Sequence, residues 1–277
     1  MGFRINTNVS SIAAQRSLNV SNRNTQSTLA KMSSGTRITK ASDDAAGLAI
    51  SEKLKATIKS NSQANRNAND GISMVQTAEG GLDEISNMLT RLRELSIQSA
   101  SDTVGDTERS FTDMEYQNLK QEIERISQVT EFNGTKLLAG QGDKLDFQIG
   151  TNNDAFQDRI SYDVKMTNAS MDSLGISSIA VGNKEGAQNS LSTIDKAIET
   201  VSGQRAGLGA IQNRLISTSN NLQVTNENLS AANSRIRDVD YAEVAAANAK
   251  NNILNQAGTS VLAQANSQGQ NALRLIG

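Results

Sequence analysis

One apolar residue recurs every seven positions through the second half of the chain. The series is Ile194, Val201, Leu208, Leu215, Leu222, Leu229 and Ile236. A seven-residue apolar repeat places a continuous stripe along one side of an α-helix and is typical of coiled-coil packing. A helix over about residues 186–236 would be on the order of 75 Å long, which is too long for an ordinary globular domain. The repeat therefore predicts an extended helical rod.

A second apolar stripe lies upstream. It comprises Val75, Ala78, Leu82, Ile85, Leu89 and Leu92, spaced three or four residues apart. This spacing predicts a second long helix with one packing face. A further helical stretch at about 114–126 follows a polar link at about 101–107 and is expected to fold back antiparallel on it. The predicted rod seam comprises Leu82, Ile85, Leu89, Leu92, Leu208, Leu215, Leu222 and Leu229.

Between the helical blocks the pattern changes from a helical period to alternation. Residues 145–149 and 160–166 alternate apolar and polar side chains, which is the period of a strand with one buried face. The sequence therefore predicts a small β-hairpin at about 140–170. In the later helix, Gly203, Gly207 and Gly209 lack the preceding strand and the lysine of a phosphate-binding loop, so we interpret them as sites of close helix packing.

The absence of two residue types excludes most catalytic and metal chemistry. The chain has no His and no Cys, and its acidic pairs, such as Asp43 with Asp44, lack companion ligands and are expected to form turns and helix caps. We expect no catalytic, cofactor-binding or metal-binding residues and no enzymatic activity. Mixed charges with a net charge of −2 argue against a nucleic-acid partner, and no apolar run is long enough for a membrane partner.

The two ends share a composition rich in Asn, Gln, Ser and Ala, with a sparse apolar stripe. We expect inter-subunit packing from Ile5, Val9, Ile12, Val20, Leu29, Leu254, Val261, Leu262, Leu273 and Ile276. Such segments bury too little alone to offset about 1–2 kcal/mol per residue of backbone ordering, so their folding should be coupled to assembly. The N-terminus also lacks the apolar run of a secretory signal, so we expect either cytoplasmic retention or export by another apparatus.

Several blocks of sequence resemble bacterial flagellin. They are residues 5–8 (INTN), 41–50 (ASDDAAGLAI), 91–98 (RLRELSIQ), 132–134 (FNG), 232–238 (ANSRIRD) and 256–266 (QAGTSVLAQAN). The blocks follow one another in the order that the family has and together are highly specific. Since only residues 132–176 separate the helical blocks, the chain resembles a short flagellin without outer variable domains.

The resemblance implies a mainly α architecture of long antiparallel coiled helices, with a terminal helical pair, a rod-like bundle and a small β-hairpin region. Residues 1–42 and 236–277 would be the two halves of an inner-tube domain. Residues 43–180 and 181–235 would form the rod. The implied function is that of a structural subunit of the extracellular flagellar filament for swimming motility, exported unfolded through the flagellar secretion channel.

The resemblance also implies partners. These are other copies of the chain, an export chaperone, and the filament cap and hook-junction proteins. For Leu273 and Ile276 we favour an inter-subunit core over dedicated chaperone anchors. A motif for a vertebrate innate immune receptor maps onto Arg91, Leu95, Gln98 and Glu115, although Leu95 equally fits a core position and Arg91 with Glu115 a solvated pair.

Two alternatives remain, of which the second belongs to a different class. A hook–filament junction or related axial protein shares the terminal pattern but adapts or caps a filament. A coiled-coil adhesin or secreted signalling protein would act without polymerising. Reassembly of long fibres from monomer distinguishes the filament subunit from both.

Overall fold

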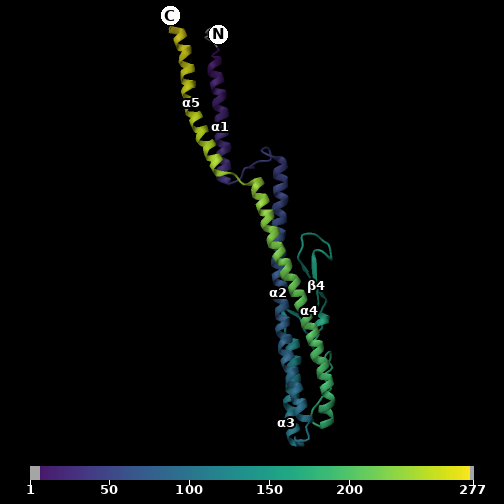
Figure 1. Ribbon diagram of the computed structural model, residues 1–277. Coiled ribbons are helices and arrows are strands. Elements are labelled where there is room, and N and C mark those ends of the chain that lie inside the picture. The colour runs from purple at the N-terminus through teal and green to yellow at the C-terminus, as the bar shows by residue number, and fades with distance from the viewer. Residues whose placement is uncertain (1–6, 275–277) are drawn as a thin grey trace. The chain divides into compact units, whose positions relative to one another are not determined.

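The structure is a computed structural model that describes residues 7–274, with side chains described up to residue 267. It contains long helices and two small antiparallel sheets (Figure 1), so the predicted mainly α fold with a small hairpin region is confirmed. The helices are α1 (Val9–Ser34), α2 (Ala45–Ala100), α3 (Asp106–Val129), α4 (Lys184–Arg237) and α5 (Tyr241–Arg274), with a 3-10 turn η1 (Val164–Thr167). The strands are β1 (Glu131–Phe132), β2 (Thr135–Lys136), β3 (Lys144–Gln148) and β4 (Arg159–Asp163).

The chain divides into two compact units. The terminal unit comprises residues 1–56 and 228–277, and the rod unit comprises residues 57–227. The helix breaks at Gly35 and at Asp238 lie close to the predicted boundaries at 42 and 236, whereas the two units divide within α2 and α4.

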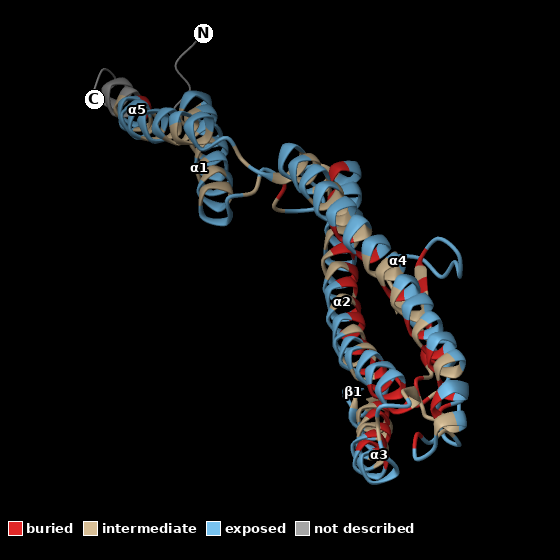
Figure 2. Cartoon of the chain, turned by 60° about the horizontal axis from the view of Figure 1, so that its bottom comes forward, coloured by how far each residue is buried: buried red, intermediate tan, exposed pale blue. Residues whose placement is uncertain are grey.

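The core of the rod unit is built largely from the two apolar stripes, one on α2 and one on α4. Buried residues gather along the inner faces of α2, α3 and α4 (Figure 2). Leu82, Ile85, Leu89, Leu92, Leu208 and Leu215 are all buried in one cluster, while Leu222 and Leu229 are half-buried. The seven-residue repeat thus marks a fully apolar seam only in the first half of α4.

The β3–β4 hairpin lies where alternation predicted it, with Phe147 opposite Ile160 in the register. Its buried face carries Ile160 and Tyr162 into the core. The β1–β2 hairpin was not predicted. It turns at Asn133 and Gly134, which both have positive φ, and this Asn-Gly pair is the preferred chemistry of a two-residue hairpin turn.

The interpretation of the α4 glycines as close packing sites is wrong. Apart from the neighbouring residues and backbone of α4 itself, no atom lies within 4 Å of the position that a Cβ would take on Gly203, Gly207 or Gly209. Close approaches in the rod occur instead at two glycines of α2. A Cβ on Gly81 would lie 2.7 Å from Leu138 Cδ1, and a Cβ on Gly71 would lie 3.1 Å from Phe147 Cδ1 and 3.2 Å from Leu215 Cδ1. A small residue is needed at Gly71 because Phe147 of β3 and Leu215 of α4 both pack against α2 at this position.

Candidate functional site

The terminal helices α1 and α5 pair through small and polar side chains. The Asn8 amide donates to the Ala265 carbonyl oxygen at 2.7 Å, and the Asn255 amide donates to the Thr25 hydroxyl at 3.0 Å. Between these two contacts, Leu18 packs on Gly258. The face that each helix turns to the other within one chain therefore combines hydrogen-bonding Asn and Thr side chains with the half-buried Leu18.

Many of the large apolar side chains of these helices point away from this contact. Val9 is 64% exposed and Ile12 58%, and no residue of α1 is fully buried. The predicted packing residues that are exposed are Val9, Ile12, Val20, Leu29, Leu254 and Val261, whereas Leu262 is half-buried. Ile5 and Ile276 lie outside the described residues, as does the side chain of Leu273. An isolated chain therefore leaves most of this stripe in water.

An apolar groove runs along the pair. It has a volume of about 810 Å³, and the floor and walls include Val20, Leu254 and Val261 together with small residues such as Ala14 and Ala257. Apolar surface of this extent on a slender helical pair is typical of a protein-interaction site. Three of the predicted packing residues thus meet in one groove.

The junction at the base of the terminal helices is fixed by backbone hydrogen bonds between the two ends of the chain. Thr36 pairs with Asp238 in an isolated antiparallel bridge, and the Val239 amide donates to the Gly35 carbonyl oxygen at 3.1 Å. The Arg237 guanidinium forms an ion pair with Glu52. These contacts join the segment that follows α1 to the segment that precedes α5.

The acidic pair of the 41–50 motif forms a turn and a cap, as predicted. The Asp43 carboxylate accepts hydrogen bonds from the Thr39 hydroxyl at 2.9 Å and from the Thr39 and Lys40 amides at 3.0 Å. These bonds, that of the Thr39 hydroxyl foremost, lower the pKa of Asp43. The Asp44 carboxylate accepts from the Gly47 amide at 2.8 Å and caps the start of α2.

The residues mapped to an innate receptor fall into two groups. Arg91 is exposed and forms ion pairs at 2.9 Å with both Glu94 and Glu115, and Gln98 is exposed on the same helix. Leu95, in contrast, is only 2% exposed and packs in the rod core. Leu95 therefore does not offer a surface contact in the folded rod, because its spacing from Leu92 places it on the buried face of α2.

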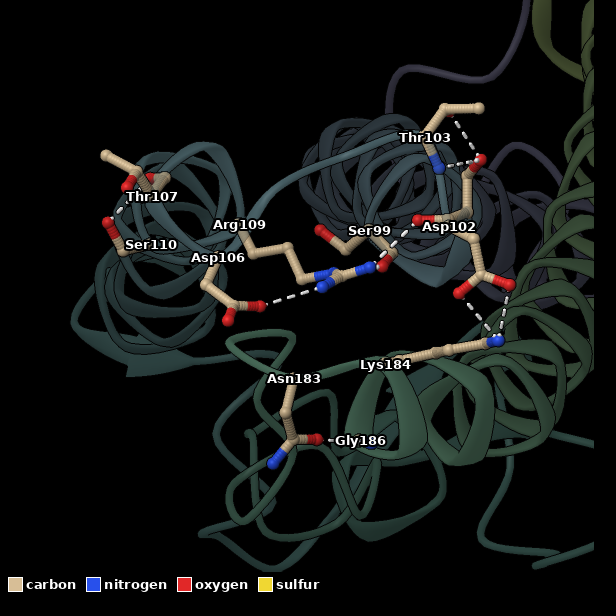
Figure 3. A network of polar contacts seen from close by, with 11 residues as sticks. Ser99, Asp102, Thr103, Asp106, Thr107, Arg109, Ser110, Asn183, Lys184 and Gly186 are labelled. Carbon is tan, nitrogen blue, oxygen red and sulfur yellow. Dashed lines mark hydrogen bonds and ion pairs between the residues drawn. The ribbon is translucent and has the colours of Figure 1, made fainter.

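At one end of the rod unit, polar contacts fix the turn between α2 and α3 (Figure 3). The buried Arg109 guanidinium donates to the Ser99 and Ser101 carbonyl oxygens, each at 2.9 Å, and pairs with Asp106 at 2.9 Å. Lys184 pairs with Asp102 at 2.7 Å and ties the start of α4 to the turn. The turn is thus held rigidly while its carboxylates face solvent.

Two ionisable groups are buried farther along α3. The Lys120 ammonium donates to the carbonyl oxygens of Ser177 at 2.9 Å and Ile179 at 2.8 Å, and burial lowers its pKa. Burial also raises the pKa of Tyr116 to about 12, against the opposing effect of the Ser96 and Ser190 hydroxyls. Lys120 thereby anchors the segment that leads into α4, while Tyr116 packs in the rod core, and apolar periodicity reveals neither role.

Within the described part of the chain, no cluster of three or more acidic side chains is placed to hold a metal ion. None of the described helices combines the length and apolar content needed to cross a bilayer.

Comparison with known proteins identifies the family. Residues 5–143 match the bacterial flagellin N-terminal helical region, and residues 191–276 match the bacterial flagellin C-terminal helical region. The flagellin of Halalkalibacterium halodurans is 43% identical over 98% of this chain and 99% of its own length. The flagellin of Bacillus subtilis is 42% identical over 99% of this chain and its full length.

The fold is similar to that of a solved flagellin. The crystal structure of Bacillus cereus flagellin aligns with a TM-score of 0.50 at 30% identity, over 61% of this chain and 94% of that one. A hook-associated protein from Vibrio parahaemolyticus shares the fold alone, with a TM-score of 0.58 at 15% identity over 71% of this chain and all of that one. Because both terminal regions match the family models and the relatives match end to end, the chain belongs to the bacterial flagellin family.

Proposed function

We propose that this chain is a non-enzymatic subunit that polymerises with copies of itself into the extracellular filament of a bacterial flagellum and serves swimming motility. Family membership supports the filament and its export in unfolded form through the flagellar secretion channel. The structural observation that carries the proposal is the exposed apolar stripe of α1 and α5, which one chain alone leaves uncovered.

The energetics favour burial of this stripe between copies. Burying a Val, Leu or Ile side chain fully is worth about 1.5–3 kcal/mol. Val9, Ile12, Val20, Leu29, Leu254 and Val261 are all available for this in each copy, with Leu262 partly so. Packed between neighbours, these side chains form the core of an inner tube, to which we also assign Ile5, Leu273 and Ile276.

Folding of the terminal helices is coupled to this burial. Helix α1 has 26 residues and buries none of them fully. Ordering its backbone costs about 1–2 kcal/mol per residue, which the polar pairing with α5 does not offset alone. The terminal segments therefore become stable helices as the subunit joins the polymer, while the rod unit, with its own core, is folded beforehand.

The other partners bind to the same exposed apolar stripe. An export chaperone that covers the apolar face of residues 236–277 prevents premature polymerisation. Filament cap and hook-junction proteins contact the same surfaces at the two ends of the polymer. A hook–filament junction role for this chain is less well supported, because the structural likeness to a hook-associated protein is one of fold alone.

Recognition by a vertebrate innate immune receptor is a second candidate function. It is supported by the exposed positions of Arg91, Gln98 and Glu115 along α2 and α3. Purified monomer should activate cells that carry the receptor, and the double variant Arg91→Ala/Glu115→Ala should do so less at equal concentration. Activation that is absent with the unmodified monomer excludes this function.

The polymerisation proposal is tested with variants of the groove. Val20→Ser combined with Val261→Ser should prevent purified protein from forming filaments that sediment and are visible by electron microscopy. Val224→Ser, at an exposed position in the rod unit, is the matched control and should assemble normally. Filaments from the groove variant at the unmodified critical concentration would contradict the proposal.

A further inference from the structure

The turn between β1 and β2 carries the only Asn-Gly sequence of the chain. Asn133 and Gly134 have φ angles of 49° and 78°, and both residues are exposed. The pair suits the backbone of a two-residue hairpin turn. It is also the pair in which an asparagine side chain is most reactive, because glycine has no Cβ to obstruct attack by its backbone nitrogen. The turn therefore combines a structural role with a chemical liability.

The atoms that would react in this turn are unobstructed. Attack joins the Gly134 backbone nitrogen to the side-chain carbonyl carbon of Asn133. Among the residues that the structure describes, neither the Gly134 backbone amide nor the Asn133 side-chain amide has a hydrogen-bond partner. Apart from its chain neighbours, no atom lies within 4 Å of the position that a Cβ would take on Gly134. Water therefore reaches both groups freely.

The hairpin that holds the turn is short. Strands β1 and β2 have two residues each and form two residue pairs. A two-stranded hairpin is only marginally stable by itself, and exposed turns open locally at a small cost in free energy. Opening releases Asn133 from its left-handed conformation, so that its side-chain carbon can approach the Gly134 nitrogen. The rod unit need not unfold for the two atoms to meet.

From these observations we infer that Asn133 is a self-modification site, which converts spontaneously to aspartate and to β-linked isoaspartate. The Gly134 nitrogen forms a bond to the side-chain carbon, the bond from that carbon to its NH2 group breaks, and ammonia leaves with the proton of the Gly134 amide. Water then opens the cyclic imide. Cleavage at the side-chain carbon gives aspartate, and cleavage at the backbone carbon gives isoaspartate. Water is the only co-reactant.

The isoaspartyl product changes the hairpin. It adds a methylene group to the main chain and replaces a neutral amide with a carboxylate. The chain after the turn cannot shift to absorb this length, because Leu137 is completely buried. The Leu137 amide donates to the Thr130 carbonyl oxygen at 3.0 Å, and its carbonyl oxygen accepts from the Thr167 hydroxyl at 3.0 Å. Modification should therefore disrupt the β1–β2 pairing and lower the stability of the rod unit.

Ageing of the purified full-length chain tests the inference. The protein is kept in a mildly alkaline buffer, and the tryptic peptide of residues 126–136 is followed by mass spectrometry. It should gain the mass that replacement of NH2 by OH brings and separate into two products, one of them a substrate for an isoaspartyl carboxyl methyltransferase. Asn152 and Asn153 are the internal control, because both are exposed but precede residues with side chains. They should react at least about tenfold more slowly.

Asn133→Gly is the matched variant. A Gly-Gly pair also fits a two-residue hairpin turn, so the variant keeps the turn and removes the reactive side chain. On ageing, the unmodified chain should unfold at progressively lower urea concentrations, whereas the variant should not change. An Asn133 that stays intact, or an equal loss of stability in both proteins, would overturn the inference. Neither measurement requires filaments, so failure here is distinct from failure of the proposed function.

Discussion

Leu18 of α1 packs directly on Gly258 of α5, so closely that a Cβ on Gly258 would lie 2.9 Å from Leu18 Cδ1. This contact lies between the hydrogen bonds that Asn8 and Asn255 make across the pair. The contact sets the separation of the two helices and so the shape of the groove that their neighbours fill.

Gly258→Leu should therefore weaken assembly. A leucine here overpacks the pair at a cost of about 1–3 kcal/mol, which corresponds to a critical concentration raised about fivefold or more. Sedimentation of polymer at a series of protein concentrations measures this. The rod unit should unfold in urea as in the unmodified protein, which separates the effect from general misfolding. An unchanged critical concentration would show that α1 and α5 do not pair in the polymer as they do here.

Gly207→Ala should stabilise the rod unit. The site lies within α4, and apart from the neighbouring residues and backbone of that helix no atom lies within 4 Å of the new methyl group. Replacing Gly by Ala in a helix interior adds about 0.5–1 kcal/mol to the free energy of unfolding. Urea unfolding followed by circular dichroism measures the change, and a loss of stability would contradict the open surroundings of this residue.

Leu89→Ala should destabilise the rod by about 2–5 kcal/mol because Leu89 is completely buried at the centre of the α2 stripe. The control is Ile97→Ala on the same helix, where the side chain is half exposed and the change should remain within about 0.5 kcal/mol. Equal effects of the two substitutions in urea unfolding would be inconsistent with the observed seam.

Tyr116 should make the rod sensitive to alkali. Burial raises its pKa to about 12 in the folded chain, above the ordinary value of 10.0. The folded state therefore holds its proton more tightly than the unfolded state. The associated stability is complete below pH 10 and is lost as the pH rises from 10 to 12.

The loss amounts to about 2–3 kcal/mol for Tyr116 alone. Tyr162 has a raised pKa as well and contributes in the same direction. The variant Tyr116→Phe isolates the first contribution, because its stability should fall less between pH 9.5 and 11.5 than that of the unmodified chain. Parallel pH curves for the two proteins would refute the assignment.

Apolar periodicity predicted the long elements well, because burial in a helical rod follows directly from spacing. The repeat from Ile194 to Ile236 predicted a helix that begins at about residue 186, and α4 begins at Lys184. Alternation of apolar and polar residues located β3 and β4. The same reasoning identified Leu208 and Leu215 as seam residues. It was less informative at Leu222 and Leu229, where the facing helix carries polar side chains and the seam is only half-buried.

Contacts that do not involve apolar stripes were harder to predict. Pairing of α1 with α5 depends on Ser, Thr and Asn side chains, such as Thr25 with Asn255, which have no periodic hydrophobic signal. The glycines of α4 were misinterpreted because sequence alone does not distinguish a crowded glycine from an open one. The buried ammonium of Lys120 was also missed, since its carbonyl partners come from an irregular segment.

The central claim is that the terminal segments drive polymerisation while the rod folds independently. Deletion of residues 1–40 or of residues 240–277, followed by electron microscopy and circular dichroism, tests it most directly. We predict that neither shortened chain forms filaments, that both keep the helical rod, and that helix content rises on polymerisation only in the intact chain. Normal filaments from either shortened chain would contradict the account.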